Sequence, residues 1–442
     1  MATVTWIGNA HDTKQISTIT VANTWAAGDT ATMTINGKDI VVTVGTTGTS
    51  TANVAIALKE AWNASTRLDG TGTTDSTSNA GGQEFGEFAE ATASVSSSVV
   101  TIIANKAGVP FTLSVTENTA GTGTATGATA QAATGKMFWD NGDNWDGGAA
   151  PSNDDTVVFR DSDVSVKYGL PNASKEVTIQ QWMSYTGEIG LPEINRDDPS
   201  KPYHEYRQRY VRLDDAGTGT DIAHRFGLGK DGIGSSLINL KHTVLKCSPI
   251  VYNTGPAKVD RVGSKALNLC CTNTSSTLNI VNGSVDCGTQ DGGAPALTTI
   301  RQTNGSLRCF TGTSSSTGAT IAGGEAVFGG SAAIGAIQAI NSGKVRIEGQ
   351  SAAITNLGVA DSAVMECPIS GVTVTSLICN GGTFDATGGG TFTVTQAEVY
   401  EPASFYDPSQ RITYTNPVKY YGELSSKLKF GGTSSSYLLI TP

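Results

Sequence analysis

The stretch NGSLRCFTGTSSSTGATIAGGEAVFGGSAAIGAIQAINSGKVRIEG, residues 304–349, contains a repeat in which a glycine is followed by alternating apolar and polar side chains. The repeat extends on both sides of this stretch, with one interval of 22 residues followed by intervals of 19. Its column positions are Gly283, Gly305, Gly324, Gly343, Ser362 and Gly381. A fixed period of about 19 residues with strand-like alternation indicates a solenoid, because one short coil cannot bury its apolar side alone.

Stacked coils place equivalent residues above one another, with neighbouring strands about 4.8 Å apart. We therefore predict a mainly β protein built on a right-handed parallel β-helix of about 19 residues per coil, preceded by a small α+β domain. An antiparallel sandwich would not keep such a column. The side chains expected to form an inward ladder are Cys287, Leu307, Cys309, Val345 and Val364. Cys287 and Cys309 share a column, so a disulfide or metal pair is the alternative to an apolar ladder, which we favour.

Composition agrees with a β structure and excludes several functions. The 442 residues include 53 glycines and only 15% charged residues, and the formal net charge is −10. Small, β-branched and turn residues at this density favour strands joined by tight turns. A basic stripe, which nucleic-acid binding requires, is missing. No apolar run reaches the roughly 20 residues of a membrane span.

The cysteines and histidines suggest neither a metal site nor a cofactor. The seven cysteines form no C-x-x-C motif, and the four histidines (His11, His204, His224 and His242) lack ligand spacing. An odd cysteine count without framework spacing indicates reduced thiols. We recognise no signal peptide in MATVTWIGNAHDTK and expect a chain that is made and kept in the cytosol or leaves by a route other than secretion.

The first part of the chain predicts a β-β-α-β-β domain, in which one helix covers a sheet of about four strands. Asn36-Gly37 is a strong hairpin signal between two alternating runs. An apolar stripe of Val54, Leu58 and Trp62 predicts the helix. The predicted organisation is an attachment domain at 1–117, a Gly/Ala/Thr linker or arm at 118–136, an opening cap and irregular coils at 137–274, regular coils at 275–395, and a C-terminal cap at 396–442.

The segment MFWDNGDNWDGGAAPSNDDTVVF, residues 137–159, predicts a joint. Asp140, Asp143 and Asp146 invite a calcium interpretation, but they stand three apart and no Glu follows at the twelfth position. We favour a structural joint and cap instead. Its expected parts are Trp139 and Trp145 lying over the open end of the helix, Pro151 ending the loop, and Asp155 opening the first coil.

Residues 193–210, EINRDDPSKPYHEYRQRY, are the most charged stretch and leave two interpretations. We favour a subunit contact rich in Tyr and Arg, with Tyr203, Tyr206, Arg207 and Tyr210 as its candidates. The alternative is a carboxylate pair for glycoside cleavage. Its candidates are Glu193, Asp197, Asp198, His204 and Glu205. Ser-His-Asp arrangements, G-x-S-x-G and phosphate loops were not found.

The motif from Trp139 to Phe159 resembles the opening segment of β-helical proteins of the autotransporter passenger type. Together with VTWIGNA and the run from Trp25 to Ala64, it also resembles a group of prophage-encoded proteins that accompany virion genes and have no assigned activity. The resemblance covers residues 3–115 and 137–192. It implies a virion surface protein, assembled in the host cytoplasm as a homotrimer, with the major capsid protein or tail proteins as partners.

We therefore expect a non-enzymatic phage structural protein, and within that class a capsid decoration (cement) protein. A tail spike or fibre that binds the receptor is the first alternative. A secreted β-helical adhesin or a polysaccharide-degrading enzyme is the second. Flat faces of small residues favour decoration, since sugar cleavage requires an aromatic and acidic groove.

Overall fold

The computed structural model describes residues 2–36, 38–63, 77–78, 90–170, 177–190, 211–213, 223–229, 238–242, 250–252, 267–271, 276–287, 297–309, 313–329, 334–349, 353–423, 428–429 and 437–440. They belong to two compact units. Gly8–Ala150 form the N-terminal unit, and the residues up to Ile7 join those from Pro151 onward in the second unit. The unit boundary therefore falls within the predicted joint.

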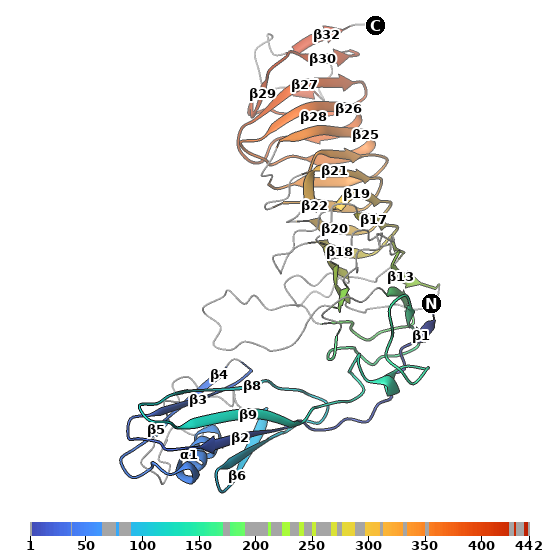
Figure 1. The fold of residues 1–442 in the computed structure, drawn as a ribbon. Helices are drawn as coiled ribbons and strands as arrows, with labels where there is room; N and C mark the ends of the chain where they lie inside the picture. Colours follow the sequence, from blue (N-terminus) through green and yellow to red (C-terminus); the bar gives the residue numbers. More distant parts are fainter. Residues whose placement is uncertain are drawn as a thin grey trace. The chain divides into compact units, whose positions relative to one another are not determined.

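The described residues of the N-terminal unit form two antiparallel four-stranded sheets and one α-helix (Figure 1). One sheet has the order β6-β7-β2-β9, formed by Ala91–Ser96, Val99–Ala104, Ile16–Ala22 and Thr124–Gln131. The other has the order β5-β4-β3-β8, formed by Thr77–Ser78, Lys38–Thr43, Thr30–Ile35 and Leu113–Asn118. Helix α1, Thr51–Asn63, shares one apolar core with both sheets.

Two predictions about this unit are confirmed. The helix buries Val54, Leu58 and Trp62, as its apolar stripe required. The β3-β4 hairpin pairs Ile35 with Lys38, and Asn36 takes the left-handed conformation that such a two-residue turn needs.

Two other predictions about this unit are wrong. Two sheets replace the single sheet of about four strands, and the supposed linker supplies a strand: β9 pairs with β2 from Ile16 to Ala22, and its Ala125 is buried. Small side chains add little burial, but pairing uses backbone groups that every non-proline residue carries. A Gly/Ala/Thr composition therefore does not prevent strand formation beside an existing edge.

The second unit is a parallel β-solenoid, as predicted; its handedness stays a prediction. Within the described residues its strands form one 24-stranded sheet that follows chain order. The early strands are β1 Thr3–Thr5, β10 Thr156–Phe159, β11 Thr178–Trp182, β12 Val211–Leu213, β13 Arg225–Leu228, β14 Ile238–His242, β15 Ile250–Val251 and β16 Leu267–Cys271. The middle strands are β17 Ser276–Ile280, β18 Ser284–Cys287, β19 Leu297–Gln302, β20 Ser306–Cys309, β21 Thr313–Ile321, β22 Glu325–Phe328, β23 Ala336–Ala339 and β24 Lys344–Ile347. The late strands are β25 Ile354–Glu366, β26 Thr373–Asp385, β27 Phe392–Tyr400, β28 Ser404–Tyr406, β29 Ile412–Tyr414, β30 Val418–Tyr421, β31 Leu428–Lys429 and β32 Tyr437–Ile440.

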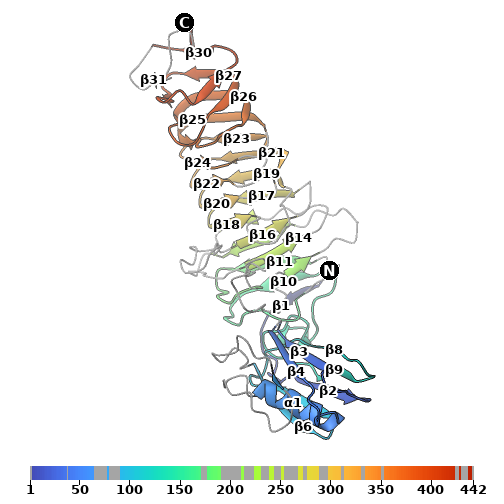
Figure 2. The same ribbon diagram turned by 90° about the vertical axis from the view of Figure 1, so that its left-hand side faces the viewer.

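Two parallel ladders run along the solenoid (Figure 2). The first ladder joins β11, β13, β15, β17, β19, β21 and β23 to the first parts of β25 and β26, and then to β27. The second ladder joins β18, β20, β22 and β24 to the last parts of the same long strands. Each coil therefore contributes one strand to each ladder. The buried side chains of both ladders fill the interior of the coil.

The inward ladder is confirmed at four of its five predicted residues. Cys287 is in register with Cys309; both side chains are buried, and neither forms a disulfide. Leu307 and Val345 are likewise fully buried, each in register with Ala326. The structure therefore favours the apolar interpretation of the cysteine column over a disulfide.

Val364 does not belong to this ladder. It is half-buried and in register with Lys344, whereas Met365 occupies the buried position beside Val345. The coil that leads to this part of β25 has 20 residues instead of 19, since Val345 is in register with Met365, and the same spacing already separates Ala339 from Val359. In a strand, a shift of one residue moves a side chain to the other face.

Both predicted ends of the solenoid also need correction. Residues 3–5, assigned to the attachment domain, form β1 and pair with β10. The described residues after 396 continue the ladders to Ile440 and are not a separate cap. Phe405 and Tyr420 lie in the buried interior there, so aromatic side chains fill the same space that smaller ones fill earlier.

Candidate functional site

The predicted joint is organised by one buried amide. Asn144 ends the 3-10 helix Gly142–Asn144 and is 0% exposed. Its Nδ2 donates to the carbonyls of Gly135 and Phe138, each at 2.8 Å, and its Oδ1 accepts from Ala10 N at 2.8 Å. One side chain therefore ties three chain segments together.

Replacing Asn144 with alanine is expected to lower the free energy of unfolding by about 2 kcal/mol, because three buried backbone groups lose their partner. Asn144→Asp keeps the acceptor but loses both donors, so we expect it to be no better than alanine. Urea titrations followed by tryptophan fluorescence measure both changes. Full stability of the alanine variant would contradict this role.

Trp139 and Trp145 pack edge to face, with ring centroids 5.0 Å apart and planes at 74°. Both are buried, and Trp145 Nε1 donates to Trp139 O at 2.7 Å. The two tryptophans belong to the N-terminal unit. Their predicted place over the open end of the solenoid therefore stays a prediction.

Pro151 and Asp155 lie at the start of the solenoid unit, as predicted for the end of the loop and the opening of the first coil. The Asp155 carboxylate accepts from Ala2 N at 2.7 Å and from Ser152 N at 2.9 Å. It thereby fixes β1 beside β10. The three aspartates of the tryptophan loop, Asp140, Asp143 and Asp146, are exposed instead. Among the described residues no group of three His, Cys, Asp or Glu side chains could hold a metal ion.

The predicted subunit contact and the alternative carboxylate pair both lie outside the described residues. The described chain resumes directly after Tyr210, at strand β12. The structure therefore adds nothing to the interpretation of Tyr203, Tyr206, Arg207 and Tyr210. The same holds for the five acidic and histidine candidates of residues 193–205.

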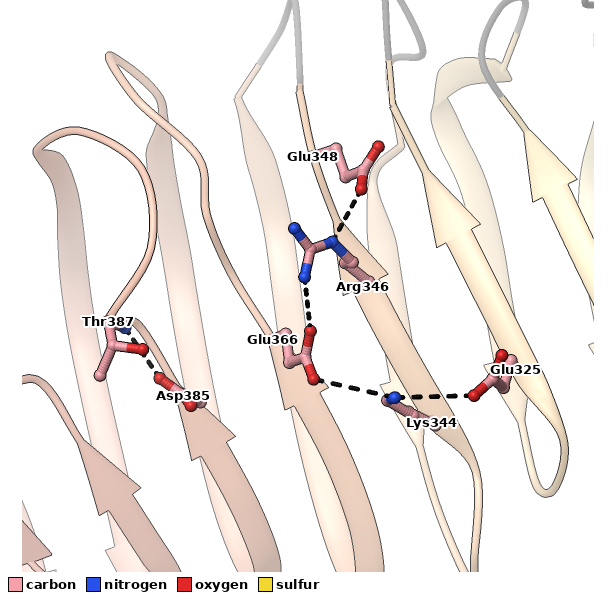
Figure 3. A network of polar contacts seen from close by, with 7 residues as sticks. All are labelled: Glu325, Lys344, Arg346, Glu348, Glu366, Asp385 and Thr387. Carbon is pink, nitrogen blue, oxygen red and sulfur yellow. Dashed lines mark hydrogen bonds and ion pairs between the residues drawn. The ribbon is translucent and has the colours of Figure 1, made fainter.

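An outward charge network lies on the second ladder and was not predicted (Figure 3). Arg346 binds Glu348 at 2.7 Å and Glu366 at 2.8 Å. Lys344 lies 3.6 Å from Glu325 and 4.0 Å from Glu366. The contacts cross from β22 through β24 to β25, so they connect three successive coils. Strand alternation beside the buried Ala326 and Val345 could have identified these outward positions.

This network is exposed, and its contribution to stability is small. Hydrogen bonds from Arg346 to Glu348 and Glu366 raise the arginine pKa, but 47% of the side chain remains exposed. Water and salt screen such pairs. The arrangement keeps charged groups paired and offers no carboxylate held in an apolar environment, which a general acid at neutral pH requires.

We expect Arg346→Gln to lower the free energy of unfolding by less than about 1 kcal/mol. The difference from the unmodified chain should shrink in high salt, which separates an ion pair from a packing effect. Arg301→Gln is the matched control, since Arg301 has no ion pair with a described residue. An Arg346 effect that is independent of salt would contradict the electrostatic origin.

A second outward cluster lies on β27 and β30. Tyr400 and Tyr421 stack with centroids 4.5 Å apart and planes at 6°. Glu398 accepts from Tyr400 Oη at 3.0 Å and pairs with Lys419 at 3.2 Å. The hydrogen bond from Tyr400 is the main cause of the lowered Glu398 pKa and correspondingly raises the Tyr400 pKa. These contacts again hold adjacent coils together.

His224 is a buried titratable group of the early coils. Its ring is 0% exposed, stacks near Phe226, and accepts the Ile179 N–H through Nδ1 at 3.0 Å. Burial lowers its pKa from 6.5 to about 3, so it is neutral at physiological pH. No local sequence pattern indicates this burial, because histidine occurs both in cores and at surfaces.

The described outer rows thus carry paired charges, stacked tyrosines and neutral polar side chains, together with a few exposed apolar side chains such as Ile378. None of the helices in the described part of the chain is both long and apolar enough to cross a membrane. Comparisons with protein-family models, with curated proteins and with solved structures found no match.

Proposed function

We propose that this chain is a non-enzymatic structural protein of a bacteriophage, displayed on the particle surface as a homotrimer and serving as a capsid decoration protein. The fold is compatible with a structural or adhesin-like protein. The observation that carries the proposal is the pairing of a small two-sheet unit with a long solenoid. A separately folded small unit suits attachment, and a solenoid suits projection from a surface.

The chemistry of the described outer rows supports a structural role. Glu325, Lys344, Arg346 and Glu366 are used in contacts between coils. The resemblance of the Trp139 to Phe159 segment to prophage-encoded proteins supports the phage context. In this proposal the chain folds in the host cytoplasm and joins the particle before lysis.

Quantitative mass spectrometry of purified particles tests the proposal. A decoration protein should be present in a copy number comparable with that of the main shell protein, and imaging should place it on the capsid. Purified chain should also bind particles that lack it. Absence from particles would overturn the phage assignment.

A tail spike or fibre is the second candidate, and exposed aromatic side chains favour it. Trp182 is 36% exposed and Tyr252 is 38% exposed. Such side chains are common where a protein binds a partner. A low copy number and labelling at the tail would support this candidate over decoration.

An enzyme would be indicated by a different result. The unmodified chain would degrade host polysaccharide, and a variant with both Asp197→Asn and Asp198→Asn would not.

A further inference from the structure

The two outer faces of the solenoid differ sharply in charge. The second ladder carries the network of Glu325, Lys344, Arg346 and Glu366. We define the neutral face as the outward residues of β17, β19, β21 and β23, of Ile354–Ala360 in β25 and of residues 373–380 in β26. One of its rows runs in register through Asn279, Arg301, Thr320, Gln338, Gly358 and Ile378. Arg301 is the one charged side chain in these strand segments.

Apolar side chains are exposed along the same ladder. Ile378 is 43% exposed on β26, and Val281 is 43% exposed directly after β17. The exposure continues into the earlier coils of the ladder, where Tyr252 follows β15 and Trp182 ends β11. Large exposed apolar side chains rimmed by polar ones indicate an interaction surface. Depletion of charge is the compositional feature of interface centres.

The polar groups of the neutral face can pair with copies of themselves. Gln338 and Asn356 each carry an amide donor and an amide acceptor, and Thr320 carries a hydroxyl that does both. A carboxylate or an ammonium group cannot pair with its own kind. Small residues such as Gly318 and Ala336 leave room for close approach, and a Cβ on Gly318 would meet nothing within 4 Å.

Charge favours a second copy of this chain as the occupant. Each copy has a formal net charge of −10, so two copies repel each other over most of their surfaces. The neutral face is a place where they can meet without opposing carboxylates. The neutral face continues into the earlier coils that carry Tyr252 and Trp182, where Arg225 of β13 is the one charge that the described strands add. From β11 to β26 the ladder is roughly 40 Å long and about 16 Å wide, hence on the order of 600 Å². That area is about three quarters of the roughly 800 Å² per partner of a standard interface.

We infer that the neutral face is the surface through which copies of this chain associate. This inference deepens the proposed function, on which it rests for the assembly into several copies. Two copies place Ala336 and Gln338 against a neutral surface, and the exposed Trp182, Tyr252 and Val281 are covered at one end of it. The charged second ladder stays exposed to solvent.

Light scattering coupled to size-exclusion chromatography on the full chain tests the inference. The unmodified chain should elute with a mass that is a multiple of 45.5 kDa. Gln338→Glu, an isosteric change at an exposed position, combined with Ala336→Glu should weaken association at least about tenfold, since unpaired carboxylates are buried between copies. Gln338→Glu alone should weaken association without any risk to folding.

Val327→Glu is the matched control. Val327 lies in the four-residue strand β22 on the second ladder, as Ala336 lies in the four-residue strand β23 on the first. Both are half-buried, so a carboxylate is added at a position of similar burial on the other face, where it lies in register with Arg308 and Arg346. Circular dichroism confirms folding of every variant.

A monomeric unmodified chain would overturn the inference, and so would folded Ala336 and Gln338 variants that associate normally. Dissociation by Val327→Glu but not by the neutral-face variants would overturn it as well. An assembly of two copies that Gln338→Glu dissociates would support the interface while contradicting the homotrimer. Association of the purified chain is measured without particles, so absence of the protein from virions would overturn the proposed function alone.

Discussion

Replacing Gly324 with alanine is expected to lower the free energy of unfolding of the solenoid by at least about 3 kcal/mol. Gly324 has φ +71°, a conformation that L side chains rarely adopt. A Cβ there would lie 2.6 Å from Gly305 N and closer still to Gly305 O. Both atoms are backbone, so the preceding coil would have to move.

The same close contact between backbones recurs along the column of turn glycines. Gly305, with φ +90°, faces Gly283 in the same way, and Glu325 N donates to Gly305 O at 2.9 Å. Moving Gly305 away from a new Cβ therefore breaks hydrogen bonds that connect the coils. Urea titration followed by far-ultraviolet circular dichroism measures the loss.

Gly318→Ala is the matched control for this prediction. Gly318 lies in the solenoid strand β21, and a Cβ there would meet nothing within 4 Å. We expect its effect to stay within about 0.5 kcal/mol in either direction. Equal stability of the two variants would show that close stacking at the glycine column does not determine the fold.

Acid should destabilise the solenoid through His224, by roughly 3 kcal/mol at pH 4 relative to pH 7. The folded pKa is lowered to about 3 from an unfolded value near 6.5. Between these values the unfolded chain binds one proton more than the folded chain. Stability is therefore lost as pH falls from 6.5 toward 3, and this contribution changes no further below 3.

His224→Asn separates this effect from the titration of carboxylates. The amide oxygen can accept the Ile179 N–H in place of Nδ1, and the side chain does not titrate. Urea titrations at pH 7, 5.5 and 4 should show a smaller loss for the variant than for the unmodified chain. His11→Asn, at an exposed position, should leave the loss unchanged. An equal loss of stability between pH 7 and pH 4 in all three proteins would exclude His224 as the cause.

Much of the solenoid was predictable from local pattern. The glycine column and the alternation around Leu307 and Val345 identified parallel stacking, because side chains alternate between the faces of a strand. The prediction based on this column was wrong at Ser362 and Val364, because their coil contains one extra residue, which changes the register. No local signal marks such an irregularity, since both Val364 and Met365 are suitable for a core.

The candidate sites were less predictable than the fold. Asn144 lay inside a recognised motif, but its three partners come from segments that only folding brings together. The pairing of Lys344 and Arg346 with Glu325 and Glu366 depends on which coils stack. Strand β9 needed the edge of β2 to exist before its small residues could pair.

The sequence by itself determined the period, the parallel stacking and the identity of most inward side chains, since these follow from spacing along one chain. The tertiary structure decided where the units divide, which coil carries an extra residue, and which outward side chains meet across coils. The physical reason is distance: alternation acts between neighbours in sequence, whereas charge pairing, burial of His224 and the contrast between the two faces arise among residues about one coil or more apart.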